Sequence, residues 1–83
     1  MNVQQLMEAL AKLPQGLPVV YLFGGAGKSP LDLVWLSRQG THVLASEYGK
    51  TVYDTIDRPL EAPDEDEDPN WQVPSDPTEP SNL

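Results

Sequence analysis

The sequence predicts a small α+β domain in which one N-terminal helix packs on a three- to four-stranded antiparallel sheet, followed by an acidic, Pro-rich C-terminal tail. Three observations carry this prediction. Apolar residues recur at helical spacing near the N-terminus, short apolar runs separated by turn residues fill positions 19–46, and prolines and acids gather after position 56. A chain of 83 residues has room for a single domain.

The helix is expected over residues 2–13. Asn2 is a favourable N-cap, and Gln5 three residues later completes a capping box. Apolar side chains then recur every three or four positions, at Val3, Leu6, Met7, Leu10 and Leu13. Pro14 disfavours helical backbone at the residue before it and therefore ends the helix.

Three strands are expected at about residues 18–23, 31–37 and 42–47. Residues 52–56 are β-prone and form either a fourth, edge strand or an extended segment packed on the sheet. Both faces of the second strand are apolar, so its alternation does not say which face meets the helix. One helix leaves the other face of such a sheet bare, and either the tail or a partner would cover it.

The charges divide the chain at residue 56. Residues 1–56 carry four acids and four bases, whereas residues 57–83 carry nine acids and one base, Arg58, which accounts for the net charge of −8. We therefore expect a domain over 1–56 and an extended or disordered tail over 57–83. Direct binding to nucleic acid or to an anionic membrane is disfavoured, because phosphates need cations opposite them. The longest apolar run has five residues, so neither a membrane span nor a secretory leader is expected.

A glycine-rich stretch at residues 24–29 matches a phosphate-binding loop only in part. Gly27, Lys28 and Ser29 fit the end of the P-loop pattern, but Leu22 stands where the first glycine belongs. The stretch also leads into a strand-like run rather than a helix, whose N-terminus would have to face the phosphate. A flexible hairpin loop is the favoured interpretation, and no cofactor is expected.

The residues available for metal binding or catalysis are few. His42 is the only histidine and there is no cysteine, so no metal site is expected. A hydrolase-type set could be assembled from His42 with Ser37 or Ser46, yet neither serine lies in a nucleophile elbow. We expect an ordinary packing role for His42 and a protein that is not an enzyme.

The most distinctive stretch is a run of five carboxylates followed by a tryptophan. It is either a solvated block that keeps the protein soluble or a surface that docks on a basic partner, mimicking the charge density of a phosphate backbone. It lacks the glycine and the final glutamate of a calcium loop. The docking interpretation, with an apolar residue of the sheet added, gives these candidate partner-binding residues: Asp64, Glu65, Asp66, Glu67, Asp68, Trp71 and Trp35.

A second pattern lies in the first half of the chain. A leucine-spaced helix leads into Leu13-Pro14-Gln15-x-Leu17-Pro18-Val19-Val20, then a glycine-rich turn, then Ser29-Pro30-Leu31 and Val34. This pattern, over about residues 3–45, resembles small uncharacterised accessory proteins of tailed bacteriophages and prophages. The resemblance implies a phage-type protein working in the bacterial cytoplasm, and it brings no catalytic residues with it.

Together these features predict a non-enzymatic accessory protein that binds a host or phage protein with a basic surface. The concrete version is an inhibitor of a host nucleic-acid-handling protein, a monomer or small homo-oligomer whose acidic tail occupies a basic groove. The alternative is a virion or assembly protein that self-associates through the apolar sheet face at Leu33 and Trp35, which predicts a stable oligomer without any partner.

Overall fold

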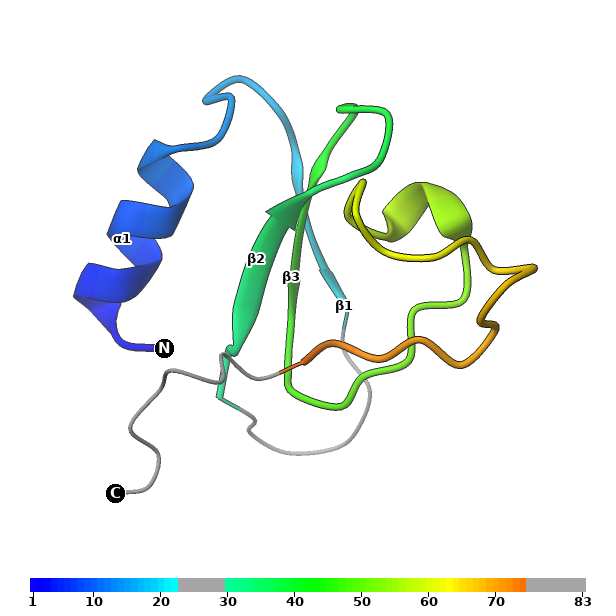
Figure 1. The fold of residues 1–83 in the computed structure, drawn as a ribbon. Coiled ribbons are helices and arrows are strands. Elements are labelled where there is room, and N and C mark those ends of the chain that lie inside the picture. Colours follow the sequence, from blue (N-terminus) through cyan, green and yellow to red (C-terminus); the bar gives the residue numbers. More distant parts are fainter. Residues whose placement is uncertain (23–29, 75–83) are drawn as a thin grey trace.

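The computed structural model describes residues 1–22 and 30–74. One helix, α1 (Val3–Ala11), precedes three strands, β1 (Val19–Leu22), β2 (Leu33–Leu36) and β3 (Val43–Ser46), and a short 3-10 helix, η1 (Thr55–Asp57), follows them (Figure 1). The predicted α+β class is confirmed. The glycine-rich stretch at 24–29 and the last part of the predicted tail, 75–83, lie outside the described residues. No helix in the described part of the chain is long and apolar enough to cross a membrane.

Helix α1 begins where the sequence predicts and ends slightly earlier. The Asn2 side chain accepts a hydrogen bond from the Gln5 amide, and the Gln5 side chain accepts one from the Asn2 amide, both at 2.8 Å. This capping box satisfies two amides that the first turn leaves without helical partners. At the other end, Gln15 donates to the carbonyls of Leu10 and Leu13, at 2.9 and 2.7 Å, and so closes the last turn.

The sheet is mixed, so the prediction of a wholly antiparallel sheet is wrong. The strand order is β1-β3-β2, in which β2 and β3 pair antiparallel and β1 and β3 pair parallel. The reason is that β3 returns between the two earlier strands instead of lying outside β2. A strand that runs opposite to β2 then runs with β1, because β1 and β2 already run in opposite directions. All four residues of β3 are buried, as expected for a central strand.

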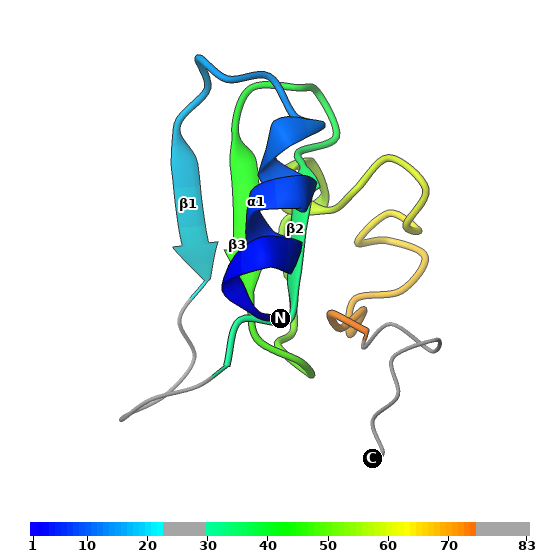
Figure 2. The same cartoon turned by 90° about the vertical axis from the view of Figure 1, so that its left-hand side faces the viewer.

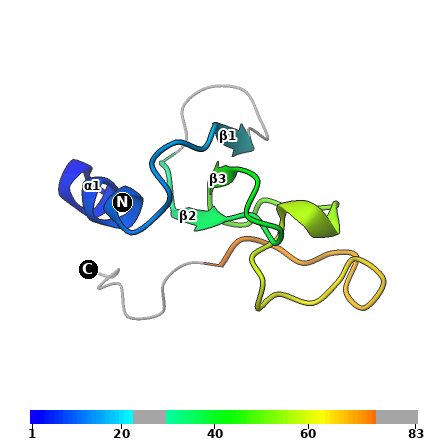
Figure 3. The ribbon, with the colours of Figure 1, turned by 90° about the horizontal axis from the view of Figure 1, so that it is seen from above.

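The pairing register assigns side chains to the two faces of the sheet. Val43 pairs with Val19 and Leu36, and these residues share the face that α1 covers. Leu44 pairs with Trp35 on the opposite face. There the core consists of Trp35, Leu44, Val52 and Val73, with Leu22, Leu33 and Trp71 packed against it. Figure 3 shows α1 on one side of the sheet and the C-terminal segment on the other.

The predicted domain boundary at residue 56 is wrong, because the packed structure continues through residue 73. Val73 is 1% exposed, and Arg58 is 0% exposed. The amide of Val73 donates to the Lys50 carbonyl, and the Val73 carbonyl accepts from the Gly49 amide, beside an isolated bridge between Thr51 and Gln72. An apolar sheet face must be removed from water, and this segment covers it.

The candidate fourth strand at residues 52–56 does not form. Thr51 makes only the isolated bridge to Gln72, and the chain then turns into η1. Val52 fits the alternative expectation of an extended segment packed on the sheet, because it is 2% exposed and belongs to the core.

Candidate functional site

The acidic residues of the C-terminal segment lie in one loop, which we define as the acidic loop, residues 61–68. It follows η1 on the side of the sheet opposite to α1 (Figure 3). Its six carboxylates belong to Glu61, Asp64, Glu65, Asp66, Glu67 and Asp68. All of these residues are exposed except Asp68, which is partly buried. The loop is therefore a surface feature, and a buried side chain beneath it holds it in place.

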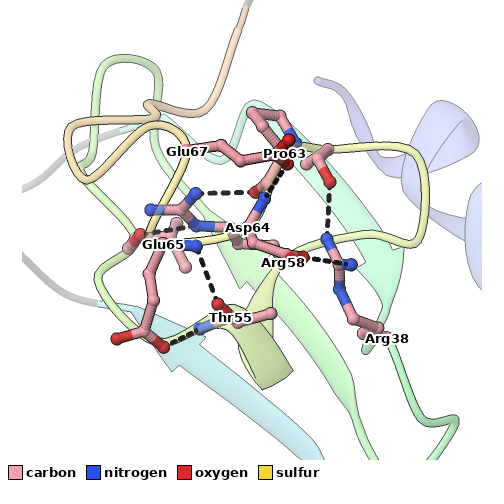
Figure 4. Close-up of polar contacts among 9 residues, drawn as sticks. Arg38, Thr55, Arg58, Pro63, Asp64, Glu65 and Glu67 are labelled. Atoms are coloured by element: carbon pink, nitrogen blue, oxygen red, sulfur yellow. Dashed lines mark hydrogen bonds and ion pairs between the residues drawn. The ribbon is translucent and has the colours of Figure 1, made fainter.

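Arg58 is that buried side chain. Its Nε donates to the Val52 carbonyl at 3.1 Å and its Nη1 donates to the Pro63 carbonyl at 2.7 Å (Figure 4). Nη2 is buried without a hydrogen-bond partner among the described residues. A buried cation is costly unless nearby groups compensate for its lost hydration. Carbonyl oxygens supply the direct bonds here, and the carboxylates of the acidic loop supply the opposing charge from further away.

Thr55 joins η1 to the acidic loop through two reciprocal bonds. Its amide donates to Glu65 Oε1 at 3.1 Å, and its hydroxyl oxygen accepts from the Glu65 amide at 2.8 Å (Figure 4). The Thr55 amide, then the Thr55 hydroxyl and the charge of Arg58 stabilise the ionised carboxylate and lower the pKa of Glu65. This acid is therefore held in its charged form by the fold.

Arg38 ties the acidic loop to the turn between β2 and β3. Its Nη1 forms an ion pair with Asp64 Oδ1 at 2.7 Å, and its Nη2 donates to the Ala62 carbonyl. The Arg38 amide also donates to the Ile56 carbonyl at 3.0 Å. The ion pair is partly open to water and adds about 1 kcal/mol or less, so its main effect is to fix the position of the loop.

Hydrogen bonds inside the loop complete its shape. The Asp64 carbonyl accepts from the amides of Glu67 and Asp68, at 3.0 and 2.9 Å, and the Asp64 amide donates to Glu67 Oε1 at 3.2 Å. These bonds resemble the capping box of a helix N-terminus. Among the described residues, only Asp64 of the six acids forms an ion pair. The loop has six carboxylates, and Arg38 and Arg58 offset two of them, so the loop and these two arginines together carry four negative charges.

The two tryptophans do not lie where a partner-binding role would need them. Trp35 is 6% exposed, and its indole N–H donates to the Asp57 carbonyl at 2.6 Å. The ring of Trp71 packs edge-on against it, with centroids 6.3 Å apart. The prediction that Trp35 contacts a partner is wrong, because residues 52–73 cover this side chain. The same residues cover the sheet face that the alternative function would need for self-association. Trp71 anchors the acidic loop to the core of its own chain.

Arg58, Arg38 and Thr55 belong to this site but were not predicted from the sequence. One signal was available, since Arg58 is the single base among the nine acids of residues 57–83. An isolated cation in so acidic a stretch indicates a structural partner. Arg38 and Thr55 stand in segments whose composition gives no such indication.

His42 lies in a separate chain of polar groups near the base of the loop. Its Nδ1 lies 2.8 Å from Thr41 Oγ1 and its Nε2 lies 2.8 Å from Asp57 Oδ1. Ser37 Oγ accepts from the amides of Thr41 and His42. These contacts link the β2–β3 turn to η1. No group of three His, Asp or Glu residues in the described segments is placed to hold a metal ion.

No protein-family model matches the chain, and neither a curated protein nor a solved structure matches it.

Proposed function

We propose that this protein is a non-enzymatic, phage-type accessory protein whose acidic loop docks on a basic surface of another protein. The single observation that supports this most strongly is the combination of exposed carboxylates with a loop held by Arg58, Thr55 and Arg38. A basic groove that normally binds nucleic acid is the complementary partner, because it is built to face closely spaced negative charges. The concrete proposal is inhibition of a host nucleic-acid-handling protein in the bacterial cytoplasm.

The rigidity of the acidic loop favours binding over mere solubility. A solvated charge block needs no fixed shape, whereas this loop is connected to the core by hydrogen bonds at both Arg58 and Glu65. A preorganised surface binds without paying the conformational entropy that a disordered tail loses on docking. The phage origin rests on the resemblance over about residues 3–45 alone.

The test is affinity capture from a bacterial lysate on the immobilised full-length protein. We expect captured proteins that elute as salt rises and that a short DNA duplex displaces, since both compete for the same basic groove. The double variant E61Q/D66N removes two loop charges whose carboxylates make no hydrogen bond to any described residue. It should lose most of the captured material.

A matched control changes the net charge equally at other sites. The double variant E8Q/E47Q neutralises one acid on α1 and one after β3, away from the acidic loop, and should capture as the unmodified protein does. Capture that survives E61Q/D66N, or that salt and duplex DNA leave unchanged, would refute the proposal.

A further inference from the structure

The polar groups around His42 place a hydroxyl group, an imidazole and a carboxylate in series. They lie between η1 and the β2–β3 turn, at the end of the sheet where the chain also passes from α1 to β1 (Figure 2). Thr41 Oγ1 is 2.8 Å from His42 Nδ1, and His42 Nε2 is 2.8 Å from Asp57 Oδ1. Thr41 is exposed, whereas the side chains of His42 and Asp57 are 19% and 25% exposed. The hydroxyl group is therefore the end of the series that faces solvent.

The hydrogen-bonding capacity of each group sets the direction of every proton in this series. An ionised carboxylate only accepts hydrogen bonds, so the imidazole carries its proton on Nε2 and donates it to Asp57. In a neutral imidazole Nδ1 is then an acceptor, and the Thr41 hydroxyl donates to it. Ser37 Oγ already accepts from the amides of Thr41 and His42, at 3.1 and 3.2 Å. Its own proton therefore points to Thr41 Oγ1, 3.3 Å away.

A hydroxyl group bonded to an imidazole that a carboxylate orients is an arrangement that activates oxygen nucleophiles. We propose that Thr41 is a covalent modification site for activated acyl donors, with His42 as its general base and Asp57 as a positioning residue. In the reaction Thr41 Oγ1 forms a bond to the acyl carbon, and the bond from that carbon to the leaving group breaks. The Thr41 proton moves to His42 Nδ1 and then to the leaving group, so the imidazole ends neutral.

The same turn limits the reaction to one acyl group. Enzymes that turn over acyl groups aim free amide N–H groups at the developing oxyanion. Here the amide of Gly40 donates to the Ser37 carbonyl, and the amides of Thr41 and His42 donate to Ser37 Oγ. An ester on Thr41 therefore lacks the stabilisation that its hydrolysis would need, and the donor itself must carry a good leaving group. Stoichiometric modification of this kind is compatible with the proposed non-enzymatic function.

The charges near Thr41 favour an uncharged donor. Asp57 belongs to the series itself, and Arg38, the base in the same turn, is engaged by Asp64 and the Ala62 carbonyl. A phosphoryl donor carries several negative charges and needs cations opposite them. An ester or a thioester has no such requirement, so it is the class of donor that suits this site.

Acetylation by p-nitrophenyl acetate tests the site, and peptide mass spectrometry locates the acetyl group. We expect Thr41 of the full-length protein to gain one acetyl group. In H42Q this reaction should be at least about tenfold slower, because glutamine cannot take up the proton. T41S keeps the hydroxyl group and should react at least as fast as the unmodified protein, because a primary hydroxyl is less hindered. Lys12, in a different part of the fold, is the internal control and should be acetylated equally in every variant.

NMR of the ring nitrogens tests the proton positions separately from the reactivity. At mildly alkaline pH His42 should show the Nε2–H tautomer. In D57N the new amide can donate to the ring, so the Nδ1–H tautomer should gain population and acetylation of Thr41 should slow. Circular dichroism verifies that each variant is folded.

Three outcomes would overturn the proposal: an unmodified Thr41 beside an acetylated Lys12, equal rates in H42Q and the unmodified protein, or an Nδ1–H tautomer in the unmodified protein. The first and the third are measured on the unmodified protein, so they do not depend on the stability of a variant. None of these outcomes bears on capture by the acidic loop.

Discussion

Arg58 is the side chain whose loss should matter most to the acidic loop. In R58M the carbonyls of Val52 and Pro63 lose their donors, and each buried acceptor left unpaired costs roughly 1–3 kcal/mol. The variant is relieved of the buried cation, which offsets part of that loss. We expect urea unfolding to show a net loss of about 2–4 kcal/mol.

The matched control is Arg38, which makes comparable contacts from a more open position, with its side chain 22% exposed. R38M should cost less than R58M, because its ion pair adds about 1 kcal/mol or less and only one buried carbonyl, that of Ala62, loses its donor. If R58M were as stable as the unmodified protein, or no less stable than R38M, then Arg58 would not be the side chain that holds the loop in place.

Glu65 gives a second prediction at a single residue, based on its lowered pKa. A depressed pKa in the folded state means that this carboxylate contributes stability above its ordinary value of 4.5. That contribution is lost as pH falls through the lower, folded value. In an NMR titration the side-chain carboxyl of Glu65 should therefore titrate below its ordinary value. T55A removes the Thr55 hydroxyl while keeping the amide and should move the midpoint part of the way back; a midpoint at or above the ordinary value in the unmodified protein would contradict the reciprocal bonds.

Helix α1 depends on its cap more than on its packing, because none of its nine residues is buried. N2A removes the acceptor for the Gln5 amide and should cost about 1 kcal/mol. In a protein of this size that corresponds to a fall in Tm of about 4–8 °C, measured by circular dichroism. Q4A, at an exposed position of the same turn, should change Tm much less. An equal effect of both variants would mean that the capping box does not hold the helix.

The elements themselves were predictable to the extent that their signals are local. The cap at Asn2, the leucine spacing and Pro14 place α1 within a few residues, and turn residues separate the three strands. Strand order was not predictable in this way. It depends on β3 being buried on both faces, and the run His42-Val43-Leu44-Ala45 has no alternation that would distinguish a central strand from an edge strand.

The segment 57–74 shows why a prediction from composition alone, that of an extended or disordered tail, was wrong there. Its prolines and acids are typical of disorder, and an average over the segment hides the few residues that bind it to the sheet. Arg58 and Val73 do that, and Trp71 packs against the core cluster that contains Val73. Of the candidate site, the carboxylates were predictable from the sequence. The residues that hold them were not, because neither composition nor periodicity indicates a contact between Arg58 and Pro63, five residues apart, or between Arg38 and Asp64, 26 residues apart.

At the scale of the molecule, residues 1–22 and 30–74 form three layers: α1, the sheet and the segment 50–74, with the acidic loop on the outer side of the third layer. This arrangement places the acidic loop and α1 on opposite sides of the sheet (Figure 3). The proposed binding function depends on the third layer being a fixed part of the fold, because a free tail would neither present a rigid loop nor cover Trp35.

Amide hydrogen exchange on the full-length protein tests that claim most directly. The amides of Val73 and Val52 donate to the carbonyls of Lys50 and Trp71, and the amide of Val43 in β3 donates to Pro18. If the third layer opens only when the whole domain unfolds, Val73 and Val52 should be protected to within about tenfold of Val43. Exchange of Val73 at the rate of an unstructured peptide, while Val43 stays protected, would contradict the account.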